Sequence, residues 1–458
     1  MNQVLYWNAI LLEASRRDHS QGYANNQQQG PTNTSRAMAI VHLAIHDAVA
    51  FMRVPGAAYL KKKLNITMAP ASPNFILEDV VDGAAYTTLN AMYPKFETYF
   101  KDSLGPSRQA GFNFGRDVAL QLLTSRANDG ANAASPAQAA PIPGSPAHRV
   151  DPYNPAQGLL GAHWGAVQLF VGPHTPLAAY PGHAGNNQPT GPAYEQDFIE
   201  VREFGAKEPR SRTAEQELIG VYWGYDGAQG LGVPPRLYNQ IARKIAIEQN
   251  LNLMQCTELF AEINVAMADA GIDAWRHKYD YNLWRPVVGI RLDPSSERDV
   301  FWAPLGAPQT NRPGARSTTP QFPAYPSGHA TFGAALFQCL RLRSAPGAAP
   351  MTVPEVLATA TTDPVVAKET FNFVSDELDG RAVDADGSVR TFHDRKMNSY
   401  SRAVYENAIS RVYLGVHWRF DGLPRNGADN VGGVPLGLDI GEKVHQFFNN
   451  APSLGGSN

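Results

Sequence analysis

The feature that most constrains the fold of this chain is the spacing of its apolar residues at three and four positions. Such an apolar stripe runs through residues 34–53, and the longest one runs through residues 252–284. This period matches the 3.6 residues per turn of an α-helix, so each stripe predicts a helix with one buried face. Further stripes predict helices over residues 76–93, 106–128, 233–249, 327–343, 364–379, 396–414 and 430–449.

Helix-capping residues indicate where some of these helices begin. Thr213 with Gln216 three positions later has the spacing of a capping box, in which each side chain bonds the other residue's backbone N–H. This box predicts one more helix, which continues through Trp223. Thr34 and Ser35 likewise predict the start of the helix over residues 34–53.

The remaining chain predicts loops. Residues 129–195 are rich in Ala, Pro, Gly and Asn, and residues 286–326 are rich in Pro, Gly, Ser and Thr. Loops this long in a compact protein are usually functional or disordered. Because no internal repeat, linker or alternating strand pattern is evident, we expect an all-α protein with a single domain over residues 1–458.

Charge and cysteine content exclude several classes of protein. The chain has 39 Lys and Arg against 42 Asp and Glu, whereas a nucleic-acid-binding surface needs a basic excess. Two cysteines cannot form a disulfide framework. Cys256 and Cys339 lie in apolar, helix-like stretches, which favours buried free thiols and leaves one bridge between them open. The sequence does not predict an oligomeric state.

The sequence predicts no membrane span and no secretory signal peptide. The N-terminal apolar stretch is short and is not preceded by a positively charged segment. Nowhere does an uncharged apolar run approach the roughly 18 residues of a membrane span. We therefore expect a soluble protein that is cytoplasmic or exported by another route.

The first segment with chemical potential contains Lys278, Arg285 and Pro286. Lys278 and Arg285 are seven positions apart, close to two helical turns, which predicts that both cations lie on one helix face. Pro286 disfavours the α conformation at Arg285, so the helix should end there. Alone, such a pair is ordinarily a solvated basic face, but the neighbouring Trp275 and Trp284 weaken that interpretation.

The second segment is Pro-Ser-Gly-His at 326–329, which precedes an apolar helical run. Pro326 and Ser327 are natural helix-start residues, and a helix N-terminus offers free backbone N–H groups to an anion. Gly328 permits close approach of the backbone to a ligand. His329 could exchange protons near that ligand. Alone, a capped helix with an incidental histidine is the plainer interpretation.

The third segment contains Arg411, His417 and Asp421. Arg411 and His417 would lie about 120° apart on an unbroken helix, so they converge only if the helix stops between them, for which Gly415 is a plausible residue. Asp421, four positions after His417, could bond one imidazole nitrogen and leave the other free as a ligand or nucleophile. Alone, this pair also fits an ordinary ion pair on a helix surface.

Together the three segments supply one lysine, two arginines, two histidines and a helix N-terminus. A tetrahedral or trigonal-bipyramidal oxyanion needs such a set, because guanidinium and ammonium groups neutralise its charge and hydrogen-bond its oxygens. The sequence therefore predicts an anion cage formed by Lys278, Arg285, Ser327, Gly328, His329, Arg411 and His417.

A separate cluster contains His42, His46 and Asp47. Histidines four positions apart on a helix can bind a metal ion. No third ligand is evident and both histidines lie in an apolar stripe, which favours buried histidines with hydrogen-bond partners.

The order of the three motifs resembles one known superfamily. Lys-x6-Arg-Pro, Pro-Ser-Gly-His and Ser-Arg-x5-His-x3-Asp are shared by type 2 phosphatidic acid phosphatases, bacterial acid phosphatases and vanadium haloperoxidases. The flanking residues, among them 322–329 and 432–437, are most similar to the chloroperoxidase branch. This similarity runs from about residue 214 to 442, the active-site core, and residues 42–47 match more loosely. Residues 340–400 resemble nothing clearly.

The resemblance implies two packed four-helix bundles and a vanadate cofactor. His417 would supply the one covalent bond from the protein to vanadium, and His329 would be the acid–base residue that acts on hydrogen peroxide. The oxygens of vanadate would be bound by Lys278, Arg285, Ser327, Gly328 and Arg411.

The resemblance also implies roles for residues around the cage. Asp226 matches the position that pairs with the last arginine, Arg411. Trp275 and Phe322 match positions that line the halide side. A histidine commonly occupies the Phe322 position in brominating relatives, so phenylalanine favours chloride.

The implied activity is oxidation of halide by hydrogen peroxide, with vanadium as a Lewis acid, to a hypohalous-acid equivalent that halogenates small organic acceptors. One alternative is an acid phosphatase, in which His417 attacks phosphorus and His329 protonates the leaving group. The Trp275–Phe322 pair and the flanking residues disfavour it. Another alternative is a non-catalytic phosphate-binding protein, which would not need His329 beside the anion. The preferred halide stays open.

Overall fold

Helices form most of the regular structure in the computed structural model, which describes residues 2–23, 26–105, 109–137, 140–142, 144–208, 211–295, 297–345, 347–450 and 453–454. The first part of the chain contains α1 (Gln3–Asp18), α2 (Gly30–Arg53), α3 (Tyr59–Leu64), α4 (Leu77–Met92), α5 (Glu97–Asp102), α6 (Gln109–Arg126), α7 (Pro192–Phe204) and α8 (Ala214–Tyr222). It continues with α9 (Pro234–Glu248), α10 (Leu253–Tyr281), α11 (Pro286–Leu292), α12 (Gly328–Ser344), α13 (Val353–Ala358), α14 (Tyr400–Tyr413), α15 (Arg419–Gly422) and α16 (Gly433–Asn449).

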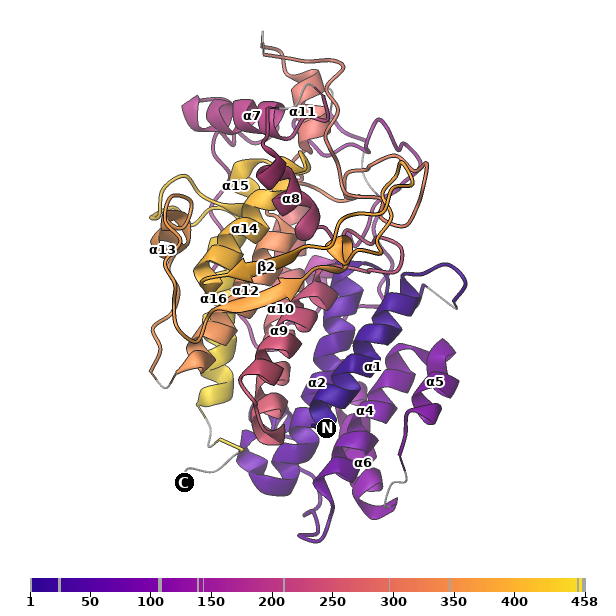
Figure 1. Cartoon of the computed structure of the whole chain (residues 1–458). Coiled ribbons are helices and arrows are strands. Elements are labelled where there is room, and N and C mark those ends of the chain that lie inside the picture. Colours follow the sequence, from indigo (N-terminus) through magenta and orange to yellow (C-terminus); the bar gives the residue numbers. More distant parts are fainter. Residues whose placement is uncertain are drawn as a thin grey trace.

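Two groups of helices pack against each other (Figure 1). Helices α1, α2, α4 and α6 form the first group, and α10, α12, α14 and α16 form the second. The long helix α10 joins them, because it packs against α2 on one side and against α12 and α16 on the other. The predicted all-α class with two packed four-helix bundles is therefore confirmed.

Glycines allow α12 and α16 to approach closely. A Cβ atom at Gly437 would lie 2.4 Å from the carbonyl oxygen of Thr331, and one at Gly433 would lie 2.5 Å from that of Ser327. Real Cβ atoms do not come this close to backbone, so these two positions accept no side chain without a shift. The contact thus places the first turn of α12, where the Pro-Ser-Gly-His motif lies.

The predicted helix over residues 364–379 is wrong. Strand β1 (Phe371–Val374) lies there, antiparallel to β2 (Asp394–Met397), with Phe371 opposite Met397. Phe371 and Phe373 are buried while Asn372 between them is exposed, which is the period of two that a strand requires. This small two-stranded sheet crosses the second helix group in Figure 1.

Several helix boundaries also differ from the predictions. Helix α1 was not predicted, and α7 and α11 begin inside the two segments expected to be loops. Helix α2 begins at Gly30, ahead of Thr34 and Ser35, with Pro31 in its first turn. The capping box of Thr213 and Gln216 is confirmed at the start of α8. Residues 106–108 of the predicted helix over 106–128 lie outside the described residues.

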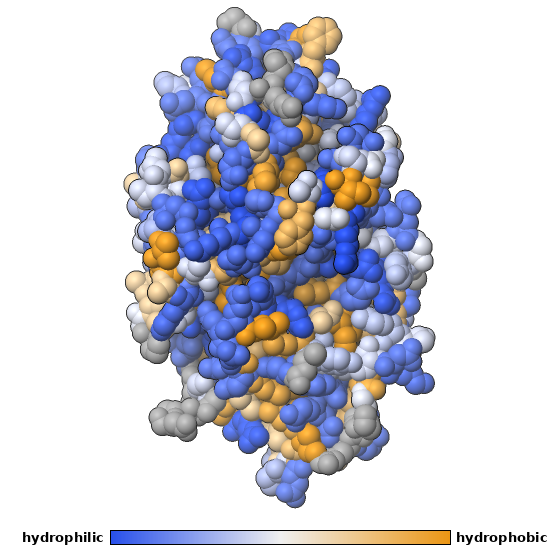
Figure 2. Space-filling model, viewed as in Figure 1, coloured by the Kyte–Doolittle hydropathy of each residue, from blue (hydrophilic) through white to orange (hydrophobic). Residues whose placement is uncertain are grey.

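The most apolar helix belongs to the protein core. Helix α2 meets the length and hydropathy criteria for a membrane span, yet 94% of its apolar window is buried inside the protein. Within the described ranges no other helix meets these criteria. Cys256 and Cys339 are both buried free thiols. The face drawn in Figure 2 is mostly hydrophilic with scattered apolar residues, which agrees with helices that direct their apolar sides inward.

We expect Gly437→Ala to lower the free energy of unfolding by about 1–3 kcal/mol, because the added methyl group overlaps the Thr331 carbonyl and the α12–α16 contact must open. Urea denaturation followed by circular dichroism measures the change. Gly56→Ala is the control, since a Cβ atom at Gly56 has no neighbour within 4 Å. Equal stability of the two variants would contradict the packing argument.

Candidate anion-binding site

The first turn of α12 begins as predicted. Ser327 is the N-cap, and its hydroxyl accepts a hydrogen bond from the Ala330 N–H at 3.4 Å. The Ser327 N–H donates to the Asp421 carbonyl oxygen at 2.7 Å, which ties this turn to the third motif. A Cβ atom at Gly328 would lie 3.1 Å from the Trp275 ring, so glycine keeps this side of the turn open. The turn presents the positive end of a helix.

Lys278 and Arg285 meet although they do not share a helix, so their predicted placement on one helix face is wrong. Helix α10 ends at Tyr281, and Asn282 adopts a left-handed conformation with φ of 46°. Arg285 is the extended N-cap residue of α11, as Pro286 after it requires. The chain turns sharply at Asn282, which the apolar spacing does not predict, and this turn brings Arg285 back toward Lys278.

Lys278 is fully buried, and backbone carbonyls surround its ammonium group. Nζ donates to the carbonyl oxygens of Pro323 at 2.9 Å, Ala324 at 3.0 Å and Pro326 at 2.5 Å. An ammonium has three donors, so Lys278 would have to exchange one carbonyl in order to bond an anion directly. Burial, followed by the charge of Arg285, holds the pKa of Lys278 well below its usual value.

Arg285 is also nearly fully buried. Nε donates to the Phe322 carbonyl at 2.9 Å, and Nη1 donates to the Val416 carbonyl at 2.8 Å and to Nε2 of His417 at 2.9 Å. Nη2 is buried and has no hydrogen-bond partner among the described residues. Burial lowers the pKa of Arg285 to about 9, although the Asp421 carboxyl opposes this shift.

Arg411 pairs with Asp226 as predicted. Its Nη2 lies 2.7 Å and 2.8 Å from the two carboxylate oxygens. Its Nε and Nη1 are buried, and no residue in the described part of the chain bonds them. Buried guanidinium donors that lack acceptors carry a desolvation cost, and a bound anion with several oxygens would remove it. On this criterion the donor set fits an oxyanion such as vanadate.

His417 is held by Asp421 in the predicted way. Helix α14 ends before Gly415, whose φ of 68° requires glycine, so the chain turns and brings His417 back toward Arg411. Nδ1 of His417 lies 2.8 Å from Oδ2 of Asp421, which also accepts the Trp418 N–H at 3.0 Å. With the hydrogen on Nδ1, Nε2 carries the lone pair, which accepts from Nη1 of Arg285 and would bind a ligand in place of that hydrogen bond.

The charges around His417 favour its neutral form. Burial, then the charges of Arg285 and Lys278, keep the pKa of His417 well below its usual value. Burial raises the pKa of Asp421 to about 8, and Lys278 and Arg285 oppose that rise. The neutral imidazole is the form that binds a metal centre.

His329 lies in the first turn of α12 and faces a different segment. Nε2 is 2.7 Å from the Gly224 carbonyl oxygen and 4.0 Å from Oδ1 of Asp226. A carbonyl only accepts, so Nε2 carries the hydrogen in this arrangement and Nδ1 has the lone pair. Burial lowers the pKa of His329 to about 3; Arg411 adds to this shift and Asp226 opposes it.

A cavity of about 290 Å³ reaches Gly328, His329 and His417. The rings of Trp275 and Phe322 line one side with centroids 4.7 Å apart, as expected for these residues. Their centroids lie 5.5 Å and 5.0 Å from Nζ of Lys278. The cavity therefore combines an apolar aromatic wall with a nearby positive charge.

Sequence reasoning missed the loop residues that complete the site. The Leu160 carbonyl accepts from Nε1 of Trp275 at 3.3 Å and from the Tyr279 hydroxyl at 2.8 Å, and the Leu160 side chain lines the cavity. Gly224 supplies the carbonyl that faces His329. The hydrogen bonds of both residues come from backbone carbonyls in irregular segments, which have no residue-type signal of their own.

The histidines of α2 do not form a metal site. Nε2 of His42 lies 3.0 Å from the Asn8 amide, and Nδ1 of His46 lies 3.0 Å from Asp47. Among the described residues no group of three or more His, Cys, Asp and Glu side chains is placed to hold a metal ion. A vanadate centre held by one histidine does not require such a group.

The fold and the site define a helical-bundle protein with a buried, cation-lined site for an oxyanion. Residues 1–104 match the vanadium chloroperoxidase N-terminal domain, and residues 258–452 match the second helical-bundle domain of the same proteins. The chain is 32% identical to vanadium chloroperoxidase of Curvularia inaequalis over an alignment 567 positions long, gaps included, which covers 98% of this chain and 90% of that protein. The chain therefore belongs to the vanadium chloroperoxidase family, whose members use a vanadate cofactor and hydrogen peroxide to oxidise halide.

Solved structures show the same fold at lower identity. A bacterial vanadium-dependent iodoperoxidase superimposes with a TM-score of 0.65 at 20% identity, over 97% of this chain and 95% of that one. A bacterial vanadium-dependent chloroperoxidase in its holo form gives a TM-score of 0.62 at 16% identity, over 95% of each chain. Nothing in these similarities favours the phosphatase or the phosphate-binding alternative.

We expect Asp421→Asn to weaken vanadate binding about 10- to 100-fold, because the amide can place an N–H opposite Nδ1 of His417 and leave the hydrogen on Nε2. Isothermal titration of the vanadate-free protein measures the affinity. Asp439→Asn is the control, since Asp439 bonds Thr175 and Lys443. Wild-type affinity in Asp421→Asn would contradict the orienting role.

Proposed function

We propose that this haloperoxidase oxidises chloride as well as bromide, with vanadate bound to Nε2 of His417. The observation that carries the proposal is the set of buried guanidinium donors of Arg285 and Arg411 that have no partner. They lie beside the imidazole of His417, whose Nε2 accepts a hydrogen bond from Nη1 of Arg285 that a bound anion would replace. An oxyanion joined to that nitrogen satisfies both arginines, which no group in the described chain does.

The residues of the cage would bind vanadate in two ways: they would neutralise its charge, and they would donate hydrogen bonds to its oxygens. Arg285 and Arg411 would donate to its oxygens with their unpartnered N–H groups, and Lys278, bonded to three carbonyls, would add positive charge nearby. The Ser327 hydroxyl and the Gly328 N–H add donors at the helix N-terminus. When bound, vanadate supplies a Lewis acid for hydrogen peroxide and keeps its oxidation state.

The overall reaction consumes one halide, one hydrogen peroxide and one proton, and releases a hypohalous acid and water. The halide loses two electrons and the peroxide O–O bond breaks. His329 is the residue that moves the proton: Nδ1 accepts it from hydrogen peroxide and returns it to the oxygen that leaves as water. A bound anion beside His329 raises its proton affinity, which the cations of the cage otherwise lower.

The aromatic wall supports oxidation of chloride. Trp275 and Phe322 line the cavity with apolar rings, and Nζ of Lys278 lies 5.5 Å and 5.0 Å from their centroids and supplies positive charge. A small, strongly hydrated halide gains most from a pocket that replaces its water with fixed positive potential. Small organic acceptors then react with the hypohalous acid equivalent.

We expect halogenation by the vanadate-free protein to appear only after orthovanadate is added, and to fade with excess phosphate, because the two anions compete for one cage. Chlorination and bromination of a simple diketone with hydrogen peroxide measure the activity. His417→Ala should abolish activity and retain the helical circular dichroism spectrum. Full activity of that variant, or vanadate-inhibited hydrolysis of a phosphomonoester without halogenation, would overturn the proposal.

We expect Phe322→His to lower the ratio of chloride to bromide turnover about tenfold, equivalent to about 1.4 kcal/mol. The polar imidazole ring would keep water beside the bound halide. Its hydrogen bond with a neighbouring group would also lower the positive charge that the halide experiences. Competition between the two halides at saturating peroxide measures the ratio. Phe332→Leu, which changes another cavity side chain and keeps it apolar, is the control. An unchanged ratio in Phe322→His would show that this wall does not select the halide.

A further inference from the structure

The segment from Tyr222 to Asp226 brings two groups to the site. The Gly224 carbonyl lies 2.7 Å from Nε2 of His329, and both carboxylate oxygens of Asp226 bond Arg411. Neither group belongs to the helices that carry His329 and Arg411. The geometry around both residues therefore depends on what holds this segment.

The segment is not held by secondary structure of its own. Helix α8 ends at Tyr222, and Tyr225 adopts a left-handed conformation with φ of 53°. That conformation is uncommon for a non-glycine residue and costs about 1–3 kcal/mol. It persists because surrounding contacts impose it.

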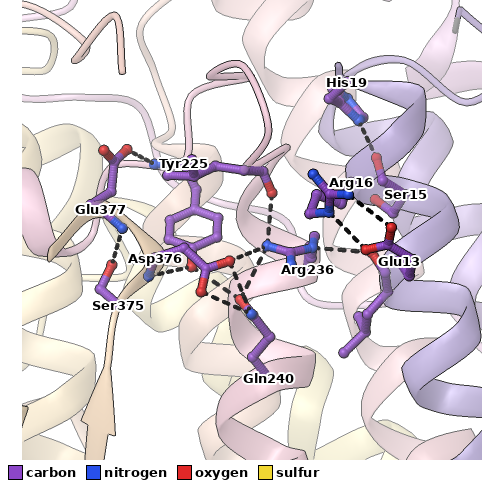
Figure 3. Close-up of polar contacts among 12 residues, drawn as sticks. Glu13, Ser15, Arg16, His19, Tyr225, Arg236, Gln240, Ser375, Asp376 and Glu377 are labelled. Atoms are coloured by element: carbon purple, nitrogen blue, oxygen red, sulfur yellow. Dashed lines mark hydrogen bonds and ion pairs between the residues drawn. The ribbon is translucent and has the colours of Figure 1, made fainter. Parts of the chain in front are cut away.

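Those contacts come from Ser375, Asp376 and Glu377, which follow strand β1 (Figure 3). The Ser375 hydroxyl donates to the Tyr222 carbonyl at 2.8 Å, and the Asp376 N–H donates to the Tyr225 hydroxyl at 2.9 Å. Oε1 of Glu377 accepts the Tyr225 N–H at 3.1 Å. Three consecutive residues thus bind both ends of the segment.

Glu377 is the member that reaches the site. A Cβ atom at Gly224 would lie 2.7 Å from its Oε1, so the carboxylate lies directly against the Gly224 backbone. It is fully buried, and its Oε2 accepts from the Thr310 hydroxyl and from Nη1 of Arg390 at 2.5 Å. A carboxylate buried this deeply is costly, and its charge is compensated at one side by Arg390.

Asp376 fixes the same segment from a second direction. Its carboxylate pairs with Arg236 of α9 at 2.6 Å and accepts a hydrogen bond from the Gln240 amide nitrogen. The Gln240 amide oxygen accepts from the Tyr225 hydroxyl at 3.0 Å. Figure 3 shows these side chains gathered around the Tyr225 ring. The aromatic side chain is therefore fixed independently, and among the described residues Glu377 is the one that accepts the Tyr225 N–H beside Gly224.

We propose that Glu377 is a positioning residue for the peroxide reaction: by binding the Tyr225 N–H it holds the Gly224 carbonyl on His329 and the Asp226 carboxylate on Arg411. The kinetic part of this inference rests on the proposed function. The structural part concerns which nitrogen of His329 carries the hydrogen, and it can be tested without vanadate.

The test compares Glu377→Ala and Glu377→Gln with Glu369→Ala. Glu369 is a matched control, because it is 3% exposed, accepts the Tyr400 N–H at 3.0 Å and pairs with Arg341. NMR of nitrogen-labelled histidine in the vanadate-free protein reports the tautomer of His329, whose resonance is identified by its loss in His329→Gln. Steady-state kinetics at saturating vanadate follow halide oxidation as peroxide is varied.

In Glu377→Ala we expect loss of the single Nε2–H tautomer of His329 and a fall of about 10- to 100-fold in kcat, with a change of less than about threefold in KM for peroxide. Glu377→Gln should retain most of the Nε2–H tautomer of His329 and most of the wild-type kcat, because its amide oxygen still accepts the Tyr225 N–H. Glu369→Ala should lose comparable thermal stability without either change. If Glu377→Ala does not fold, Thr310→Val, which removes one donor to Glu377, should shift the tautomer in the same direction to a smaller extent.

An unchanged His329 tautomer in a folded Glu377→Ala or in Thr310→Val would overturn the inference. Equal changes in Glu369→Ala would also overturn it, since they would reduce Glu377 to a general stability residue. If the tautomer changes as expected but the wild-type protein halogenates nothing, the positioning role stands and the proposed function fails.

Discussion

The structure depends on the burial of positive charge that the chain itself does not fully compensate. Lys278, Arg285 and Arg411 are 0%, 1% and 1% exposed, and two carboxylates, Asp226 and Asp421, lie beside them. Burying a guanidinium whose donors lack acceptors is unfavourable. The folded protein therefore favours binding of an anion with several oxygens, which would accept from these donors. The family's vanadate cofactor is such an anion, and its binding is expected to stabilise the fold as well as to create the active centre.

Close packing and hydrogen bonds hold the backbone around the buried charges in place. The glycine contact between α12 and α16 places the first turn of α12, and the Ser327 N–H links that turn to the Asp421 backbone. The His329 carbonyl is held in turn by the Tyr238 hydroxyl and the Asn407 amide. Preorganised donors of this kind need not reorient when charge develops in the reaction, which is the main source of electrostatic catalysis.

Local sequence predicted those features that a few neighbouring residues decide. The start of α12 at Ser327, the break at Gly415 and the bond between His417 and Asp421 each follow from residue types within five positions of one another. The failures arose where periodicity was ambiguous or was carried too far. The apolar spacing predicts a helix over residues 364–379, but Phe371 and Phe373 alternate with exposed residues as in a strand. It also predicts one helix over residues 252–284, whereas α10 ends before the turn at Asn282. The single-domain prediction and the roles of individual site residues stay predictions.

The sequence by itself determined the helical class, the motif order and, through its resemblance, the chemistry of the cage, because these depend on residue identity and short-range spacing. Only the tertiary structure decided that the Lys278 ammonium donates to three carbonyls and that Glu377 lies against Gly224. It also decided that Arg285 and Arg411 have buried N–H groups without a partner among the described residues. These facts involve backbone atoms and residues far apart in the sequence, such as Glu377 and Gly224. A backbone carbonyl or N–H is the same in every residue, so its partner is set by how the chain packs and cannot be read from the letters alone.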